Sequence, residues 1–211
     1  MQQIIEIKNL VAGYNGQAVI ENVNLSLYDR DFLGIIGPNG GGKTTLLKVM
    51  IGLEKPISGT VTRAKHLKIG YLPQYNAADK QFPITVRDTV MMGLNSELGL
   101  WGRINEKQKA TVKATLERFH LTSLASRPLK ALSGGQLQRV LMARATVSSP
   151  DVIVLDEPHT YIDKQFEGEF NRILEEERRR CAIVMVSHNV EYVRKTASKL
   201  IHVDKTVSLL S

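Results

Sequence analysis

The stretch GPNGGGKTT at residues 37–45 combines glycines, a lysine and two hydroxyl side chains at a spacing that suits phosphate binding. Its glycines leave backbone N–H groups free to curl around an anion, and a helix beginning at its end adds partial positive charge. Lys43 would reach the β- and γ-phosphates of a nucleoside triphosphate, and the Thr44 hydroxyl would ligate Mg²⁺. The residues assigned to the nucleotide are Gly37, Pro38, Asn39, Gly40, Gly41, Gly42, Lys43, Thr44 and Thr45.

Two carboxylates end the apolar run VIVLDE at residues 152–157. Asp156 stands where it can hold the water shell of a metal ion, and Glu157 where it can polarise an attacking water. An isolated Asp-Glu pair would equally well be an ordinary surface pair. Together with the phosphate loop, it predicts the hydrolytic half of a triphosphate site.

A second glycine-rich stretch, SGGQ at residues 133–136, has no lysine and no strand before it. Ser133 is a good N-cap, and Leu137, Val140 and Leu141 follow at helical spacing. This stretch therefore predicts another helix start that suits an anion. Because it is remote from the phosphate loop in the chain, the simplest arrangement is a dimer in which a second copy supplies it.

The elements around these residues predict an α/β fold. The runs at 32–36, 152–155 and 182–186 are apolar on both faces, as buried parallel strands are, and helical patterns follow the first two. The segments 4–10, 17–20 and 23–28 predict short antiparallel strands, with a turn at Asn15-Gly16. Helical patterns fill 84–147. We expect one domain over 1–211, a mostly parallel sheet with an N-terminal antiparallel β subdomain and an inserted helical subdomain at about 84–147.

Composition limits the class of protein. The chain has 211 residues, is 43% hydrophobic and 23% charged, and carries a net charge of +7. No apolar run approaches the roughly twenty residues of a membrane-spanning helix, and no signal peptide is apparent. One cysteine predicts neither a disulfide nor a metal-ligand cluster, so we expect a cytoplasmic protein. Residues 101–130 hold seven basic residues against two acidic ones, which indicates a solvated helical face, or one that meets lipid headgroups or an acidic partner.

The motif LSGGQ at 132–136, with the phosphate loop and the Asp-Glu pair, carries a family resemblance. Over essentially all of its length the chain resembles the ATP-binding subunit of an ABC (ATP-binding cassette) transporter. The resemblance implies a head-to-tail homodimer in which Ser133, Gly134, Gly135 and Gln136 of one copy contact the γ-phosphate bound by the other. It also implies ATP as substrate with Mg²⁺.

The resemblance assigns roles to further residues. Tyr14 matches the aromatic residue that stacks on adenine, and Gln74 the glutamine that joins the Mg²⁺ site to the helical subdomain. His188 matches the histidine that contacts the γ-phosphate and orients Glu157, while Asp163 matches the aspartate of an intersubunit loop. The chain departs from the family pattern in that loop, where His159 and Tyr161 stand at positions that usually hold small residues, and Ile162 replaces a leucine. A neutral surface histidine is the ordinary interpretation of His159.

The resemblance further implies what the chain would drive. It predicts a peripheral subunit on the cytoplasmic face of the cell membrane, bound to two integral-membrane permease subunits, with a substrate-binding protein engaged only indirectly and no nucleic acid. The permease segments would dock near residues 74–95, where Met91 and Met92 suit either an adaptable apolar contact or an ordinary place in the core. The sequences GPNGGGKTTLLK and FPITVRDTVMMG are similar to those of zinc or manganese importers. Iron or iron-chelate importers share these features, and a soluble ABC ATPase without a transport role is a further alternative.

Overall fold

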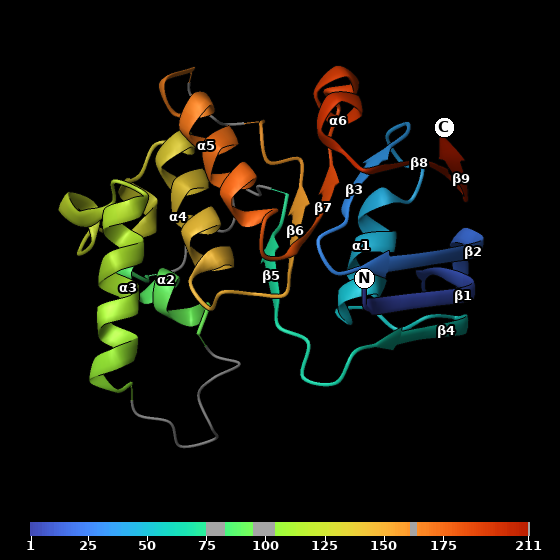
Figure 1. Cartoon of the computed structure of the whole chain (residues 1–211), viewed down its shortest axis with the longest axis horizontal. Coiled ribbons are helices and arrows are strands. Elements are labelled where there is room, and N and C mark those ends of the chain that lie inside the picture. The colour runs from blue at the N-terminus through green and yellow to red at the C-terminus, as the bar shows by residue number, and fades with distance from the viewer. Residues whose placement is uncertain (75–82, 95–103, 161–163, 211) are drawn as a thin grey trace.

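The computed structural model describes residues 1–74, 83–94, 104–160 and 164–210, arranged as two sheets and a block of helices (Figure 1). The strands are β1 (Gln3–Tyr14), β2 (Gln17–Tyr28), β3 (Phe32–Ile36), β4 (Ser58–Arg63), β5 (Ile69–Leu72), β6 (Val152–Asp156), β7 (Ala182–Val186), β8 (Lys199–Asp204) and β9 (Thr206–Leu210). The α-helices are α1 (Lys43–Ile51), α2 (Val86–Met92), α3 (Glu106–Arg118), α4 (Gly134–Thr146), α5 (Lys164–Glu177) and α6 (Val190–Thr196). Two short 3₁₀ turns, η3 (Thr122–Leu124) and η4 (Leu129–Ala131), precede α4.

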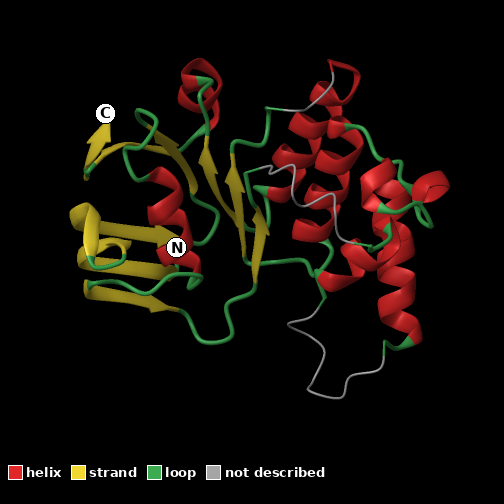
Figure 2. Ribbon diagram, turned by 180° about the vertical axis from the view of Figure 1, so that it is seen from behind, coloured by secondary structure: helices red, strands yellow, loops and turns green. Residues whose placement is uncertain are grey.

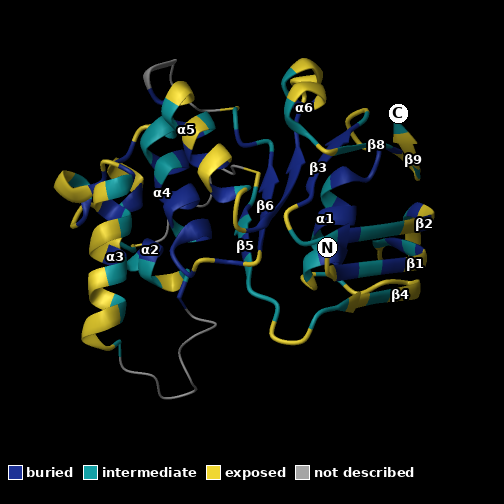
Figure 3. Cartoon of the chain, in the orientation of Figure 1, coloured by how far each residue is buried: buried dark blue, intermediate teal, exposed yellow. Residues whose placement is uncertain are grey.

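The larger sheet has the strand order β5-β6-β7-β3-β8-β9, with β9 antiparallel and the other strands parallel. Its central strands are the three predicted apolar runs, and every residue in them is buried (Figure 3). Alternate residues of β6 enter different cores, because Val152 and Val154 pack with α1 whereas Ile153 and Leu155 pack with α4 and α5. Two covered faces explain why these strands are continuously apolar instead of alternating.

The smaller sheet, ordered β2-β1-β4, is antiparallel as predicted. The prediction of separate strands at 17–20 and 23–28 is wrong, because both belong to the single strand β2. Asn22 has a φ of 51° and the register shifts around it, so the extra residue forms a bulge and pairing with β1 continues. Asn15 and Gly16 (φ 52° and 77°) form the predicted turn. Strands β4 and β5 were not anticipated.

The helical block leaves the larger sheet and returns to it at adjacent positions. Strands β5 and β6 are direct parallel neighbours, with Ile69 opposite Val152, although α2, α3 and α4 lie between them in the chain. The whole block is therefore one excursion from the sheet (Figure 2). A capping box starts α3, since Asn105 Oδ1 accepts from Gln108 N at 2.9 Å and Gln108 Oε1 accepts from Asn105 N at 3.0 Å.

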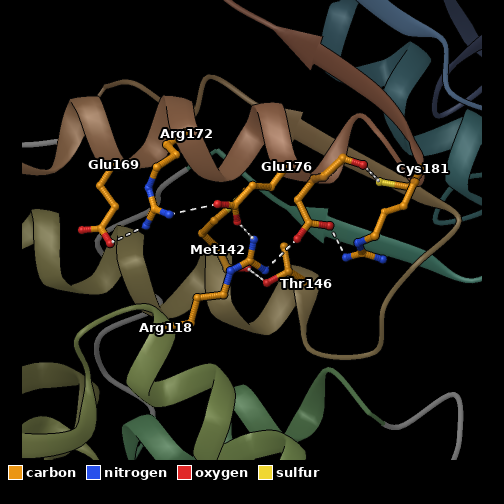
Figure 4. Close-up of polar contacts among 9 residues, drawn as sticks. Arg118, Met142, Thr146, Glu169, Arg172, Glu176 and Cys181 are labelled. Atoms are coloured by element: carbon orange, nitrogen blue, oxygen red, sulfur yellow. Dashed lines mark hydrogen bonds and ion pairs between the residues drawn. The ribbon is translucent and has the colours of Figure 1, made fainter.

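Ion pairs join the helical block to α5 (Figure 4). Arg118, at the end of α3, donates to Glu177 Oε1 at 2.7 Å and to Glu176 Oε2 at 2.8 Å. The Glu177 side chain is only 1% exposed and also pairs with Arg180, so its charge is compensated from two sides. Arg172 completes the row at the surface by pairing with Glu176 at 2.9 Å. Within the described ranges, no helix is long and apolar enough to cross a membrane.

Candidate active site

The predicted site residues converge at the carboxyl edge of the parallel strands. The phosphate loop follows β3, Gln74 follows β5, Glu157 follows β6 and His188 follows β7. They surround a cleft of about 520 Å³ that is lined by Tyr14, Val19, Asn39, Gly40, Gly42, Lys43, Thr44, Thr45, Gln74, Glu157 and His188. Ligands of open α/β sheets bind at this edge because the loops from several strands meet there.

The phosphate loop depends on glycine at its two ends. Gly42 adopts a left-handed conformation (φ 97°) as the N-cap of α1, and a Cβ there would stand 2.2 Å from a methyl carbon of Ile20. Gly37 has a φ of 148°, and a Cβ would stand 2.1 Å from the Val203 carbonyl oxygen. Both clashes involve well-packed neighbours. The loop can therefore approach β2 and β8 closely only because these residues lack side chains.

Lys43 and Thr44 line the cleft and have different hydrogen-bond partners. Lys43 is buried, and its Nζ donates to the carbonyl oxygens of Gly37 at 3.0 Å and Pro38 at 2.8 Å. The ammonium group thus lies against the start of the phosphate loop, beside the place where a bound phosphate would lie. Thr44 Oγ1 donates to Asp156 Oδ2 at 2.9 Å, which brings together the two residues predicted to serve one metal ion.

Asp156 has the character of an incomplete metal ligand. It is 1% exposed, and its Oδ1 is a buried atom with no hydrogen-bond partner in the structure. Burial raises the pKa of this carboxyl group, while the Thr44 hydroxyl opposes that rise. No cluster of three or more His, Cys, Asp or Glu side chains suited to a metal ion occurs among the described residues. A Mg²⁺ ion held by one carboxylate, one hydroxyl and nucleotide phosphates fits this arrangement.

Glu157 lies at the mouth of the cleft with both oxygens contacted. His188 Nε2 stands 2.8 Å from Oε1, and Gln74 Nε2 donates to Oε2 at 3.4 Å. The backbone of Glu157 has a φ of 54°, and its N–H donates to the Val186 carbonyl at 3.0 Å. A non-glycine residue in this conformation costs free energy, which the surrounding contacts must offset. The turn directs the carboxylate away from the sheet and into the cleft.

Tyr14 also lines the cleft. The residue is 39% exposed, its hydroxyl lies 3.5 Å from Thr45 Oγ1, and Lys48 Nζ stands 5.6 Å from the ring centroid. These contacts with α1 hold the ring beside the phosphate loop. An exposed aromatic face at this place can stack on a nucleotide base.

The second glycine-rich stretch forms the helix start that was predicted. Ser133 is the N-cap of α4 in a capping box, with its Oγ accepting from Gln136 N at 3.2 Å and its N–H donating to Gln136 Oε1 at 3.0 Å. None of the cleft-lining residues comes from 133–136. Within one copy the stretch is thus not part of the cleft. Asp163, Tyr161 and Ile162 lie outside the described residues.

Sequence reasoning missed some contributors to the site. Val19 of β2 lines the cleft. Gln138 of α4 is buried, and its Nε2 donates to the Pro158 carbonyl at 2.8 Å, which ties the loop after Glu157 to the helix that Ser133 starts. No local pattern relates residues twenty positions apart. A buried glutamine on the apolar side of a helix was the one available signal.

Comparison with known proteins identifies this arrangement. A family model described as ABC transporter matches residues 20–160, which span the phosphate loop, the LSGGQ motif and the Asp-Glu pair. The chain belongs to the ABC transporter family. It is 38% identical over 207 residues to a Chlamydia pneumoniae protein named "Probable metal transport system ATP-binding protein", covering 94% of this chain and 84% of that one. It is 36% identical over 206 residues to the zinc import ATP-binding protein ZnuC of Haemophilus ducreyi, covering 97% and 74%.

Solved structures of ABC transporters share the fold. One, of a transporter assigned to the metal-chelate type in an inward-facing conformation, superposes with a TM-score of 0.86 at 27% identity, covering 100% of this chain and 84% of that chain. A dimeric bacterial ABC transporter cassette superposes with a TM-score of 0.82 at 25% identity, covering 97% of both chains. The predicted α/β fold with an antiparallel N-terminal sheet and inserted helices is therefore confirmed.

Proposed function

We propose that this chain is the ATP-hydrolysing subunit of an importer that moves a metal ion, zinc or manganese, through separate membrane subunits. The observation that carries the proposal is the position of Glu157, contacted by His188 and Gln74, at the mouth of a cleft whose floor holds Lys43 and Thr44. A carboxylate held beside a phosphate loop suits the activation of water for attack on a γ-phosphate. The names of the metal-transport relatives support the type of cargo.

The cleft would hold ATP from end to end. Tyr14 would stack on adenine, and the phosphates would follow the backbone N–H groups of residues 39–45 down to the start of α1. Lys43 would exchange its contacts with the Gly37 and Pro38 carbonyls for β- and γ-phosphate oxygens. The lysine lies at the bottom of the cleft and needs no large movement to do so.

Three residues would hold Mg²⁺: Thr44, Asp156 through water, and Gln74. The unpartnered, buried Oδ1 of Asp156 is the feature that such an ion would satisfy. When bound, Mg²⁺ neutralises phosphate charge as the transition state develops. Glu157 would take a proton from the attacking water, and His188 would hold the carboxylate toward the γ-phosphate. Gln74 contacts the same carboxylate and leads into the helical block, so it would report on the occupancy of the cleft.

Hydrolysis would require two copies of the chain. The residues from Ser133 to Gln136 form a helix start that suits an anion yet lie outside the cleft of their own copy. In a head-to-tail dimer they would contact the γ-phosphate of the other copy, and Asp163 would belong to the loop between copies. ATP would thus close the dimer, and hydrolysis would release it.

The partners would be two integral-membrane permease subunits at the cytoplasmic face of the membrane. A groove of about 340 Å³ between α2 and α3 offers a docking place, with a floor that includes Met91, Val112 and Leu116. Arg87, Lys109 and Lys113 stand on its rim. An apolar floor with a basic rim suits an amphipathic segment that carries acidic residues. A substrate-binding protein would act only through the permease, and we expect no nucleic acid.

A second candidate cargo is iron or an iron chelate. The likeness to the metal-chelate type structure, which covers the whole chain, supports it. A soluble ABC ATPase that acts on ribosomes or nucleic acid is the remaining alternative. These candidates share the ATP site and differ only in what the closing dimer moves. Partner identity therefore separates them.

The test is a pull-down of tagged Glu157→Gln protein from its native membranes with ATP and Mg²⁺. The proposal predicts co-purification of a protein with several membrane spans, and the matched sample without ATP controls for non-specific capture. Loss of zinc or manganese uptake in cells lacking that partner would identify the cargo, whereas loss of iron uptake would favour the second candidate. Recovery of ribosomes, nucleic acid or soluble proteins alone would contradict a transport role.

A further inference from the structure

The loop that follows Glu157 is held by three helices. Gln138 of α4 donates to the Pro158 carbonyl at 2.8 Å. The His159 ring meets Phe170 of α5 edge-on, with centroids 5.2 Å apart and an interplanar angle of 76°. It meets Tyr192 of α6 in the same manner at 4.8 Å and 69°. His159 thus sits between the helices that follow β6 and β7.

These contacts close a circuit around the site. From Glu157 the chain runs through Pro158 to His159, whose ring touches Tyr192. Tyr192 N–H donates to Asn189 Oδ1 at 3.0 Å, which fixes the first turn of α6 directly after His188. The circuit closes where His188 Nε2 meets Glu157 Oε1 at 2.8 Å. The segments 157–159 and 188–192 are therefore joined at both ends. The His159 and Tyr192 rings meet at one end, and the Glu157 carboxylate meets the His188 imidazole at the other.

We propose that His159 is a positioning residue that holds Glu157 against His188 by clamping the loop after β6 to α6. The inference rests on the proposed role of Glu157 in hydrolysis. Loss of the ring would remove the contacts of the 158–160 loop with α5 and α6 and leave the bond from Gln138 to Pro158, so that Glu157, whose left-handed conformation is sustained by its surroundings, would be held less firmly. The carboxylate would then spend less time in the orientation that attack requires.

The environment of His159 suits a neutral aromatic clamp. Burial lowers the pKa of His159, and the Asn171 side chain and the charge of Glu167 oppose this only in part. Neither His159 Nδ1 nor Asn171 Oδ1 has a partner at full hydrogen-bond distance. The ring edges of His159 contact Phe170 and Tyr192, and these contacts locate the ring between α5 and α6. A residue of similar flat shape can replace it, and a small residue cannot.

The test compares His159→Thr, which removes the ring, with His159→Phe, which keeps a flat aromatic edge. ATP turnover and ATP affinity are measured for both, and His66→Asn serves as a control that removes an exposed histidine elsewhere. We expect the threonine variant to lose about tenfold in kcat with ATP affinity almost unchanged, and the phenylalanine variant to recover most of that loss. Unchanged turnover in the threonine variant, equal loss in both variants, or a loss confined to ATP affinity would overturn the proposal.

A second readout does not depend on turnover. NMR signals of the His188 ring, assigned with a His188→Gln variant, report on its contact with Glu157. We expect them to shift in His159→Thr and to stay in place in His159→Phe and His66→Asn. If the wild-type chain hydrolysed no ATP with its partners, the proposed function would fail, whereas an unmoved His188 signal in His159→Thr would refute the clamp itself.

Discussion

Nε2 of His188 lies 2.8 Å from Oε1 of Glu157, although the two residues follow different strands, β7 and β6. These strands are parallel neighbours, with Asp156 opposite Val186, so the residues that follow them emerge side by side. The contact is therefore a consequence of the sheet order, which carries both residues to the mouth of the cleft. It leaves the Glu157 carboxylate oriented by an imidazole and not by a permanent cation.

Replacement of this carboxylate gives the first prediction. Glu157→Gln keeps the shape of the side chain and removes the proton acceptor, so ATP turnover should fall by about 10²–10⁴-fold while ATP stays bound. Trapped ATP should then hold two copies together, which size-exclusion chromatography with ATP and Mg²⁺ would detect as a dimer. Glu191→Gln removes an exposed carboxylate from α6 and is the matched control. A monomeric Glu157→Gln protein that hydrolyses ATP at the normal rate would refute the role of Glu157.

Much of this geometry could be predicted from the sequence, because it depends on local patterns. The apolar runs at 32–36 and 182–186 match β3 and β7 residue for residue, since strands buried on two faces favour apolar residues along their whole length. The phosphate loop has a required order of glycines, which a short motif records. The joining of 17–20 and 23–28 into β2 escaped prediction because an asparagine in a bulge has the same local signature as an asparagine in a turn.

Contacts between distant residues could not be predicted in this way. The bond from Gln138 to Pro158 and the ring contacts of His159 depend on how α4, α5 and α6 pack on the sheet. Sequence alone favours a neutral surface histidine at 159, whereas the structure has it half-buried between two aromatic rings. Side chains whose surroundings come from three separate helices leave no periodic signal.

Asp156 gives the second prediction, on metal binding. The buried carboxylate has one unpartnered oxygen, so Asp156→Asn should remove the Mg²⁺-dependent part of ATP binding and abolish turnover. Binding at a hundredfold excess over Kd stabilises a fold by about 2.7 kcal/mol, and most of this gain should vanish in the variant. Thermal unfolding with EDTA, with Mg²⁺ and with both Mg²⁺ and ATP measures it. Asp151→Asn, at an exposed position before β6, is the control. An unchanged gain in Asp156→Asn would exclude Asp156 from the metal site.

The same carboxylate predicts a pH dependence. Burial raises the pKa of Asp156 in the folded chain above its ordinary value of 3.8. The folded state therefore binds this proton more tightly than the unfolded state does, so the contribution to stability is present at low pH and is lost as the pH rises through the raised pKa. Without metal, the unfolding free energy of Asp156→Asn should therefore increase relative to that of the wild type as the pH rises across the acidic range. Urea unfolding at several pH values in EDTA measures this gap, and a constant gap would contradict the prediction.

The composite site gives a prediction for Ser133. Ser133→Arg places a long side chain at the helix start that would meet the phosphate of the other copy, so ATP should still bind while hydrolysis fails. Ser133→Ala loses the same N-cap, at a cost of about 1 kcal/mol, without blocking the approach. The difference in turnover between these variants isolates the contact between copies from the lost cap. Full hydrolysis by Ser133→Arg, measured at a concentration where it is monomeric, would exclude the composite site.

Arg118 gives a prediction about how the helical block is attached. Arg118→Met would leave Glu177, only 1% exposed, with Arg180 alone for compensation. Loss of one partner of a buried ion pair costs about 3–5 kcal/mol of unfolding free energy. Because Arg180 still pairs with Glu177, we expect a loss near the lower end of this range. Arg172→Met makes the same substitution on an exposed arginine and should cost less than about 1 kcal/mol. Urea unfolding measures both. Because Arg118 ends α3 and Glu177 ends α5, equal losses in the two variants would mean that this ion pair does not attach the helical block to α5.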